Sequence, residues 1–473
     1  MGDTRSRVVF RGIGAAAIAI AGGIFAWPHA CGAETMYSAL VKAYQNNPQL
    51  NAQRASARVT DEAVPQALSG YRPRVSITGT LGEQYSDVLS KSRSQGITVY
   101  QDTHGTTSPW TVGATATQTV FNGFQTGNRT RAAEGQVSAA REGLRVMEQQ
   151  ILLAAATAYM DVLRDTANLE VQRTNVRVLE ETLKQTRDRF NVGEVTRTDV
   201  AQAEAQLAAG QSAVAAAEST LNTSRAAYRQ IVGTEPVNLQ PGSPVDRFSP
   251  RTLAVAIDTG LVENPNVTSA MYGVDIAFLQ VKINEGALFP NLTLQGNVQE
   301  ANFPQISIVR QFTASVVGQL TVPIYQGGGE FSLIRQSKES LSQQRLSLDL
   351  VRNQTRQAVV QAWGQLQAAK AQIAAAQSQV TSSEVALNGV REEARVGQRT
   401  TLDVLNAQQA LVNARVALVI AQHDRVVASY NLLAAIGRLS PPVLGLPTTV
   451  YDPMVHYQQV RDAWTGIRNP DGR

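Results

Sequence analysis

The chain has 473 residues, of which 6% are aromatic and 17% are charged, and its formal net charge is +4. So few aromatic residues argue against one thick core and favour long surfaces packed with small side chains. Half of the net charge lies in the first 33 residues, so the rest of the chain lacks the basic surface that nucleic-acid-binding proteins use.

Residues 1–33 have the pattern of a secretory signal peptide, with a basic start, an apolar run and a small-residue cleavage site that ends at Ala33. The apolar run is too short for a membrane helix, which needs ~20 residues. Cys31 is the only cysteine, and Pro28 makes the sequence before it a poor lipoprotein box. No later stretch approaches the length of a membrane helix, so the exported chain is either soluble or crosses a membrane as strands.

The second half of the chain repeats the first. Gly193 and Gly397 occupy matching turn motifs 204 residues apart, and the same offset relates Gly233 to Gly437. A fixed offset between long segments means that one supersecondary unit is used twice. We therefore expect the following division: a first repeat at 34–233, a linker at 234–251, a second repeat at 252–437 and a C-terminal tail at 438–473. The Pro-rich linker and tail are both predicted to be irregular.

Each repeat opens with a helix that starts at an Asn-Pro pair, Asn47–Pro48 or Asn264–Pro265. Two segments follow in which apolar residues alternate with Thr, Ser, Gln and Asn, a pattern typical of strands with one apolar and one uncharged polar face. The predicted strands are at about 74–85 and 110–121 in the first repeat and about 291–299 and 312–323 in the second. The segments linking each pair, Ser86 to Ser108 and Ala301 to Gln311, are predicted to be loops, because they differ in length.

A long proline-free segment follows each strand pair and predicts a helical hairpin, at about 124–233 and 328–437. Apolar residues recur at strict sevens along these arms, which indicates coiled-coil packing. The columns are Val162, Leu169, Val176, Leu183 and Phe190; Leu366, Ile373, Val380 and Leu387; Val200, Leu207, Val214, Leu221 and Tyr228; and Val404, Leu411 and Leu418, where the next position is Arg425. One arm of 66 residues would be about 100 Å long, too long for a compact domain.

Amphipathic strands in an exported chain suggest an outer-membrane barrel, but four strands cannot close one, since single-chain barrels begin at about eight. Open strand edges in lipid would leave backbone groups unpaired. Subunits must therefore pool their strands. Three copies would give a twelve-stranded β-barrel with a polar lumen, continued by a twelve-helix α-helical coiled-coil barrel, so the expected fold is mainly α with a small β part.

A helix, a strand pair and a helical hairpin occur in this order twice after the signal peptide. This arrangement resembles that of the TolC-like family of outer-membrane efflux and type I secretion channels. The resemblance covers about residues 34–440, and its most specific residues are the two hairpin tips, Arg189–Val200 and Val396–Leu405. It implies a homotrimer in the lipid of the Gram-negative outer membrane, with its helical part in the periplasm. It also implies that the channel conducts passively and docks a periplasmic adaptor protein and an inner-membrane transporter.

The same resemblance assigns roles at the tips. Asp403 corresponds to the acidic ring at the narrowed periplasmic mouth, with Asn406 where the best-known member has a second acidic residue. Arg399 corresponds to a closed-state latch that reaches Thr198 and Asp199 of a neighbouring coil. Ala394 replaces a tyrosine that serves as a second latch in that member. These expectations describe a pore constriction that opens more easily than in that relative.

The tip residues Val192, Gly193, Val396 and Gly397 correspond to the family's adaptor-docking motifs. Ordinary turn chemistry is an alternative explanation for them, because a glycine that ends a helix is common. A capping box with a threonine followed three residues later by an aspartate likewise explains Thr196 with Asp199 and Thr400 with Asp403.

The chain shows no constellation of nucleophile, base and acid, so we do not expect an enzyme. Its four histidines are scattered and Gly327–Gly329 lacks the ending of a phosphate-binding loop, so neither a metal nor another cofactor is expected. Two other functions remain open at this point, an exported structural coiled coil or adaptor and a stand-alone porin. The sequence does not distinguish drugs from secreted proteins as cargo.

Overall fold

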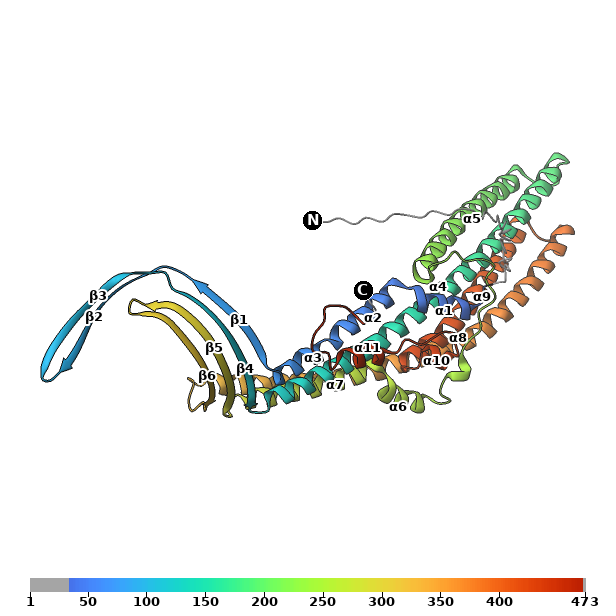
Figure 1. Cartoon of the computed structure of the whole chain (residues 1–473). Coiled ribbons are helices and arrows are strands. Elements are labelled where there is room, and N and C mark those ends of the chain that lie inside the picture. Colours follow the sequence, from blue (N-terminus) through green and yellow to red (C-terminus); the bar gives the residue numbers. More distant parts are fainter. Residues whose placement is uncertain (1–33, 471–473) are drawn as a thin grey trace, which may run out of the picture.

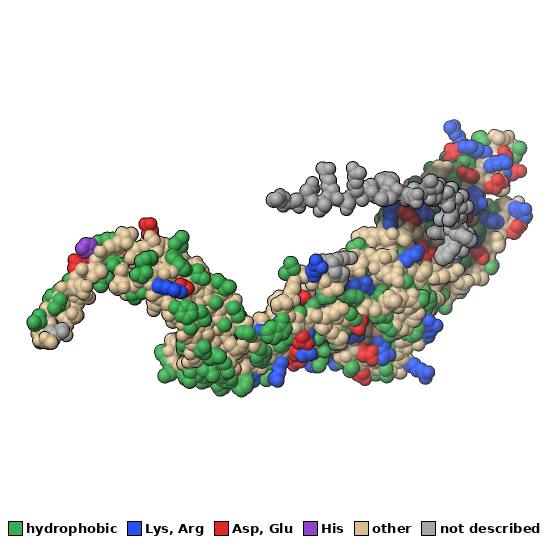
Figure 2. All heavy atoms as spheres, viewed as in Figure 1, with side chains coloured by type: hydrophobic (Ala, Val, Ile, Leu, Met, Phe, Trp, Pro, Cys, Tyr) green, Lys and Arg blue, Asp and Glu red, His purple; other side chains and the backbone are tan. Residues whose placement is uncertain are grey.

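The computed structural model describes residues 34–470, so the predicted signal peptide and Cys31 lie outside the described residues. The molecule is elongated, with the strands gathered at one end and long helices continuing away from them (Figure 1). Figure 2 shows apolar side chains predominating over the strands, whereas Lys, Arg, Asp and Glu gather mainly over the helices. The distribution of polarity thus follows the division between strands and helices.

Two helical hairpins form the long part of the molecule. Helices α4 (Gln125–Asn191) and α8 (Gly329–Arg395) each have 67 residues, and the returning helices α5 (Arg197–Val232) and α9 (Thr401–Ala435) have 36 and 35. The predicted columns lie at the helix interfaces, where the following members are buried: Val162, Leu169, Leu183, Leu221, Tyr228, Leu366, Leu387 and Leu411. At Gly210 of α5 an added Cβ would lie 2.9 Å from Cδ1 of Leu179 in α4, so the hairpin helices approach closely. The prediction of coiled-coil packing is confirmed.

The returning helices are only about half as long as α4 and α8, and shorter helices cover the remaining length. In the first repeat these are α1 (Met36–Asn46), α2 (Pro48–Asp61) and α3 (Ala63–Leu68), which pack along α4. In the second repeat α6 (Leu253–Glu263) packs on α8, and α7 (Pro265–Gly286) packs along both α4 and α8. Shorter helices therefore take the place of the returning helices along the rest of α4 and α8.

The duplication extends to individual side chains. Asn47 caps α2 by accepting hydrogen bonds from the N–H groups of Gln49 and Leu50, and its Nδ2 donates to the carbonyl of Ile231 at 3.1 Å. Asn264 caps α7 by accepting a hydrogen bond from the N–H of Asn266, and its Nδ2 donates to the carbonyl of Ala435 at 2.9 Å. Each asparagine thus starts one helix and ties it to the end of a returning helix.

Four strands form one antiparallel sheet in the order β1-β4-β5-β6. Their bounds are Arg74–Leu81 for β1, Trp110–Asn122 for β4, Asn291–Gln305 for β5 and Ile308–Thr321 for β6. Within this sheet β1 and β6 are the edge strands. The apolar residues of β4, among them Trp110, Val112 and Val120, are exposed and alternate with less exposed polar residues, so the sheet has the two faces that the sequence predicts.

The prediction of a loop between Ser86 and Ser108 was wrong. This segment forms a second, two-stranded sheet of β2 (Gln84–Ser94) and β3 (Ile97–Thr107). Its turn places Gln95 and Gly96 at φ 52° and 84°, the left-handed conformations that a tight hairpin turn requires. The ribbon pairs its own backbone groups, so it forms without the apolar alternation on which the sequence prediction relied.

The predicted loop from Ala301 to Gln311 was also wrong, since β5 and β6 continue through it and leave only residues 306–307 between them. Pro304 lies within β5, next to Phe303, which has φ 48°. The strand register shifts between Asn302 and Gln305, so the proline sits at a local irregularity, where a strand tolerates it.

The Pro-rich tail is not irregular as predicted. It contains two short helices, α10 (Pro441–Leu444) and α11 (Pro453–Val460), each of which begins at a proline. Proline is favoured at the first helical position because its missing N–H would be unpaired there anyway. The linker at 234–251 contains one short 3-10 helix, η2 (Asp246–Phe248), and a bridge from Leu239 to Glu34.

The largest group of buried apolar residues lies where α1, α4, α5, α8 and α9 meet the linker. Its bulkiest fully buried members are four tyrosines: Tyr44, Tyr159, Tyr228 and Tyr430. The hydroxyl oxygen of Tyr159 lies 2.8 Å from the carbonyl oxygen of Glu34 and 2.7 Å from that of Gln240. This core therefore fixes the start of the described chain and the linker against α4.

Among residues 34–470, α9 is the one helix that is long and apolar enough to cross a membrane, with a mean hydropathy of 1.3 over its most apolar window. From the sequence, this segment was predicted as one arm of a helical hairpin and not as a possible membrane helix. In the structure α9 packs along α8 and α4, and a third of that window is buried. Its apolar surface therefore serves helix packing.

Candidate functional site at the hairpin tips

The turns at the two hairpin tips have the same backbone geometry. At the first tip the N–H of Gly193 donates to the carbonyl of Phe190, and the N–H of Glu194 donates to that of Arg189, both at 2.9 Å. Gly193 has φ +82°, and Gly397 at the second tip has φ +79°. This is a Schellman motif, in which a left-handed residue satisfies the last carbonyl groups of the helix, and glycine adopts it without strain.

A capping box starts the returning helix at each tip. Oδ2 of Asp199 accepts hydrogen bonds from the N–H of Thr196 at 2.9 Å and from its hydroxyl at 2.7 Å. Oδ2 of Asp403 accepts from the N–H and the hydroxyl of Thr400 at 3.0 and 2.9 Å. The turn-chemistry explanation of these four residues is thus confirmed. Since each set of bonds stabilises the charged carboxylate, it lowers the pKa of Asp199 and of Asp403.

Arg399 is bound within its own hairpin, where its Nε donates to Oε2 of Glu393 at 2.8 Å. Within residues 34–470 of one chain it forms no hydrogen bond to Thr198 or Asp199. Arg399 and Asp199 nevertheless line one groove between the two tips, with a volume of about 930 Å³. Arg399 and Asp199 therefore lie at the same groove. A contact between Arg399 and Asp199 of a neighbouring coil stays a prediction.

Asp403 and Asn406 lie three residues apart, near the start of α9, so they project from one side of the helix. The Asn406 side chain is exposed. Asp403 is charged at neutral pH, as aspartates ordinarily are, and the bonds from Thr400 lower its pKa further. The pair thus presents one fixed charge and one neutral amide next to the tip.

The proposed docking residues protrude from the molecule. Val192 and Val396, one at each tip, are 72% and 70% exposed. A Cβ added at Gly193 or Gly397 would meet nothing within 4 Å. Two matching apolar side chains therefore stand on rigid turns with open space beside them.

Sequence reasoning missed a chain of polar contacts that joins the two hairpins below the tips. Arg391 of α8 donates to Oε1 of Gln408 at 3.1 Å, and Nε2 of Gln408 donates to Oδ1 of Asn175 in α4 at 3.3 Å. Gln408 and Asn175 are both buried. Buried amides need hydrogen-bond partners, so the arrangement fixes α9 against α4. Polar residues next to the heptad columns were a signal that a buried polar contact exists here, but they do not specify the partner of each residue.

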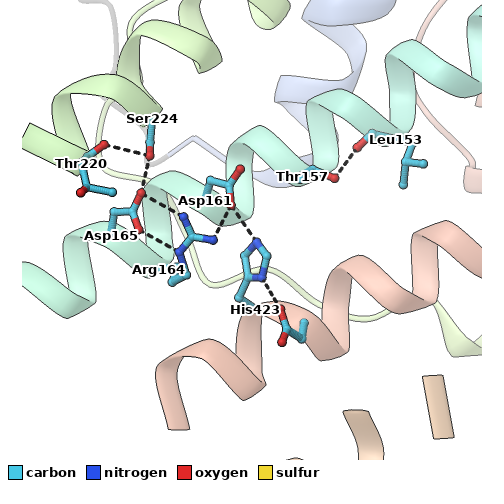
Figure 3. A network of polar contacts seen from close by, with 9 residues as sticks. Leu153, Thr157, Asp161, Arg164, Asp165, Thr220, Ser224 and His423 are labelled. Carbon is cyan, nitrogen blue, oxygen red and sulfur yellow. Dashed lines mark hydrogen bonds and ion pairs between the residues drawn. The ribbon is translucent and has the colours of Figure 1, made fainter. Parts of the chain in front are cut away.

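A second polar network, farther from the tips, was also missed. It joins Asp161, Arg164 and Asp165 of α4 to Ser224 of α5 and His423 of α9 (Figure 3). Arg164 pairs with both aspartates at 2.8 Å, and the hydroxyl of Ser224 donates to Oδ2 of Asp165. Three helices from both repeats are therefore held by one set of charges.

His423 lies between two carboxylates in this network. Its Nδ1 is 2.8 Å from Oδ1 of Asp424, and its Nε2 is 2.9 Å from Oδ1 of Asp161. The latter contact has ion-pair distance, and Nε2 forms no hydrogen bond within residues 34–470. Burial lowers the pKa of the imidazole, but the two aspartates raise it by more, so the pKa of His423 lies above its ordinary value.

The comparison with protein families identifies the family to which this fold belongs. A family model described as "Outer membrane efflux protein" matches residues 39–234 and 256–438. The chain belongs to this family. The matched ranges include both strand pairs and both hairpins, so the whole duplicated unit carries the identification.

Two named relatives and one solved structure agree. Outer membrane efflux protein BepC of Brucella suis biovar 1 is 43% identical, over 97% of this chain and 97% of its own length. Outer membrane protein TolC of Vibrio cholerae serotype O1 is 27% identical, over 86% of this chain and 92% of its own length. The crystal structure of CusC superposes with a TM-score of 0.74 at 17% identity, covering 85% of this chain and 91% of CusC.

These findings confirm the predicted resemblance, the outer-membrane location and the mainly helical fold with a small strand part. The protein is an outer-membrane exit duct of the kind used by efflux and type I secretion systems. Family members are channels rather than enzymes. Among residues 34–470, no three His, Cys, Asp or Glu side chains lie together as metal ligands would.

Proposed function

We propose that three copies of this chain close a twelve-stranded barrel by pairing β6 of one subunit with β1 of the next. The observation that carries this proposal is the open sheet. Its edge strands β1 and β6 both carry exposed apolar side chains, among them Val75 and Ile77 of β1 and Val316 and Leu320 of β6. Unpaired backbone groups in lipid cost several kcal/mol each, and antiparallel pairing between copies removes both edges at once.

The helical hairpins of the three subunits would then continue the lumen into the periplasm and narrow at their tips. A ring of three Asp403 carboxylates near the axis would attract cations and repel anions, and Asn406 would add no charge to it. Arg399 would hold the mouth closed by binding Thr198 and Asp199 of a neighbouring coil. Opening would replace that contact with the Arg399–Glu393 pair, which one hairpin forms by itself.

We propose that the exposed tips dock a periplasmic adaptor, through which an inner-membrane transporter delivers cargo. Val192 and Val396 supply apolar contact area at equivalent places on both hairpins, and Gly193 and Gly397 leave room for a partner to approach. Since BepC is named as an efflux protein, small-molecule efflux is the proposed cargo class. The energy for transport comes from the transporter.

Disulfide cross-linking tests the assembly. Val75 lies at the start of β1 and Leu320 near the end of β6, so a Val75→Cys, Leu320→Cys double variant should form covalent trimers in outer-membrane fractions. The matched control is Val75→Cys with Phe312→Cys, because Phe312 lies toward the opposite end of β6 and should not cross-link. A chain that stays monomeric in these membranes, or cross-links equally in both variants, contradicts the proposed ring.

A further inference from the structure

The C-terminal part of the chain returns along the first repeat toward the strands. Helix α11 packs on α2, where Nδ1 of His456 lies 3.0 Å from Oδ2 of the buried Asp61. The guanidinium of Arg141 in α4 lies 4.8 Å from the ring of Tyr457. Two independent contacts therefore fix α11 on the helical part, and α11 lies beside α2 in Figure 1.

Beyond α11, the chain is held at the start of β1. Nη1 of Arg72 donates to the carbonyl of Ala463 at 2.6 Å, and its guanidinium lies 4.6 Å from the ring of Trp464. Arg72 precedes Arg74, the first residue of β1. Residues 461–470, which we call the C-terminal segment, are thus attached to the junction between helices and strands.

Aromatic side chains mark this junction all the way across the sheet. One aromatic residue lies within a few positions of the periplasmic end of each of the four strands, and each is at least half exposed: Tyr71, Phe124, Phe289 and Tyr325. Aromatic residues gather at membrane–water interfaces because their rings suit the headgroup level. For an outer-membrane protein whose helices extend into the periplasm, this level is the periplasmic leaflet.

The C-terminal segment places two more large apolar side chains near this level without covering them. Trp464 is 69% exposed and Ile467 is fully exposed. The segment carries the cations Arg461 and Arg468 and one acidic residue, Asp462, while Arg72, which contacts Trp464, and Arg74 lie at the junction. An exposed tryptophan among arginines matches a phospholipid surface, where the ring enters the headgroup region and the guanidinium groups bind phosphate.

We infer that the C-terminal segment is a membrane-surface anchor that binds phospholipid headgroups of the periplasmic leaflet through Trp464, Ile467 and the surrounding arginines. The inference rests on the outer-membrane location and goes beyond the conduit function. The anchor holds the helices next to the strands against the bilayer through Arg72, which precedes the start of β1. Each subunit carries its own anchor.

Tryptophan fluorescence tests the inference, because the chain from residue 34 onward has only Trp110, Trp363 and Trp464. The probe is the full mature protein, with two of the three tryptophans changed to phenylalanine, reconstituted into phosphatidylglycerol–phosphatidylcholine vesicles whose acyl chains carry bromine close to the headgroup. The variant that keeps Trp464 should lose fluorescence as the fraction of brominated lipid rises. The loss should be smaller when the bromine sits deep in the acyl chains.

The other two tryptophans are internal controls. Trp110 lies on the apolar face of β4, so it should be quenched whenever the strands are in the bilayer, while Trp363 of the periplasmic helix α8 should not be. If Trp110 is not quenched, the barrel itself is misplaced and the conduit proposal fails. If Trp110 is quenched but Trp464 is not, only the anchor is overturned.

Quenching by aqueous acrylamide gives two further outcomes. If Trp464 is shielded from acrylamide equally in detergent and in lipid, a neighbouring subunit covers it. If acrylamide quenches Trp464 freely in vesicles, the side chain lies in water. Either result overturns the inference. An Arg468→Gln variant adds a charge test, because it should reduce the extra quenching of Trp464 in anionic over neutral vesicles and leave Trp110 unchanged.

Discussion

Nε2 of His423 in α9 lies 2.9 Å from Oδ1 of Asp161 in α4, so a charged contact joins helices from the two repeats. The rest of the network extends the contact through Arg164 and Asp165 to Ser224 in α5. Because the His423 imidazole and the Asp161 carboxylate are partly removed from water and lie close to opposite charges, their protonation states are linked to folding. This relationship gives a stability that depends on pH.

A His423→Gln variant should be less stable than the wild type at mildly acidic pH, and the difference should shrink as the pH rises. The raised pKa of His423 means that its contribution is complete below the ordinary histidine pKa of about 6.5 and is lost as pH passes through the raised value. Burial raises the pKa of Asp161, but His423 and Arg164 lower it by more, so its contribution disappears only in stronger acid.

Thermal unfolding of the wild type and of His423→Gln, between mildly acidic and mildly alkaline pH, measures how their stability difference depends on pH. His104→Gln is the matched control, because His104 lies in the exposed β2–β3 ribbon and its loss should shift the melting temperature little at any pH. A stability difference for His423→Gln that stays constant across the range would show that the network does not titrate.

Changing Arg399 to alanine should raise the single-channel conductance of the resting trimer. The variant removes the guanidinium that we expect to bind Asp199 of a neighbouring coil, and charge-assisted bonds of this kind are the ones that opening must break. Planar-bilayer recording gives the conductance directly. Arg395→Ala serves as the control, since Arg395 pairs with Glu392 on the exposed surface of the same helix. Equal conductance in wild type and Arg399→Ala would reject the latch.

Neutralising Asp403 with asparagine should reduce the cation selectivity of the channel, measured as the reversal potential in a salt gradient. In the wild type the selectivity should persist below the ordinary aspartate pKa of about 3.9, because bonds from Thr400 lower the pKa of Asp403. Asp199→Asn is the matched variant, as Asp199 occupies the same capping box in the other hairpin. If both variants lose cation selectivity equally, the result contradicts a specific role of Asp403 at the pore constriction.

Placing glutamate at Val192 and Val396 should abolish export while trimers still assemble. The change puts charges on the two apolar tips without altering the glycines that the turns require. Export is scored as drug resistance of a deletion strain carrying the variant, and assembly as trimers resistant to dodecyl sulfate. A Val262→Glu control carries the same change at an equally exposed valine on α6. Normal resistance in the double variant would contradict docking at the tips.

Changing Asn264 to aspartate should separate its two contacts. Aspartate still caps α7 but cannot donate to the carbonyl of Ala435, so the variant should lose about 0.5–1.5 kcal/mol of stability with this hydrogen bond. Alanine at this position should cost more, since it also loses the cap, which typically contributes about 1 kcal/mol. Chemical unfolding of the three proteins gives both differences. Equal stability of wild type and the aspartate variant would show that the cap alone matters.

The sequence predicted the features that depend on short-range or periodic patterns. The matching tips at Gly193 and Gly397 and the capping boxes follow from residues a few positions apart, and the heptad columns follow from a fixed spacing. The chain from Arg391 through Gln408 to Asn175 joins residues more than 200 positions apart. No local pattern specifies such contacts.

Arg425 is another residue whose contact could not be predicted from a local pattern. It interrupts a heptad column, and in the structure it pairs with Asp246 of the linker, 179 residues away. The β2–β3 ribbon was missed for a different reason. Its strands, with polar residues such as Lys91 and Asp102, have little apolar alternation, and they are held by their own backbone pairing. Apolar patterning reveals a buried face, and this ribbon has none.

Helices α4 and α8 are both 67 residues long, and their returning partners differ by a single residue. The two hairpins therefore extend the same distance from the strands, so their tips lie at the same level. An insertion or deletion in one hairpin would leave its tip out of level with the other, so length changes should be tolerated only when they occur in both hairpins and in whole heptads. The span that such a protein can bridge is accordingly adjustable in steps of about 10 Å.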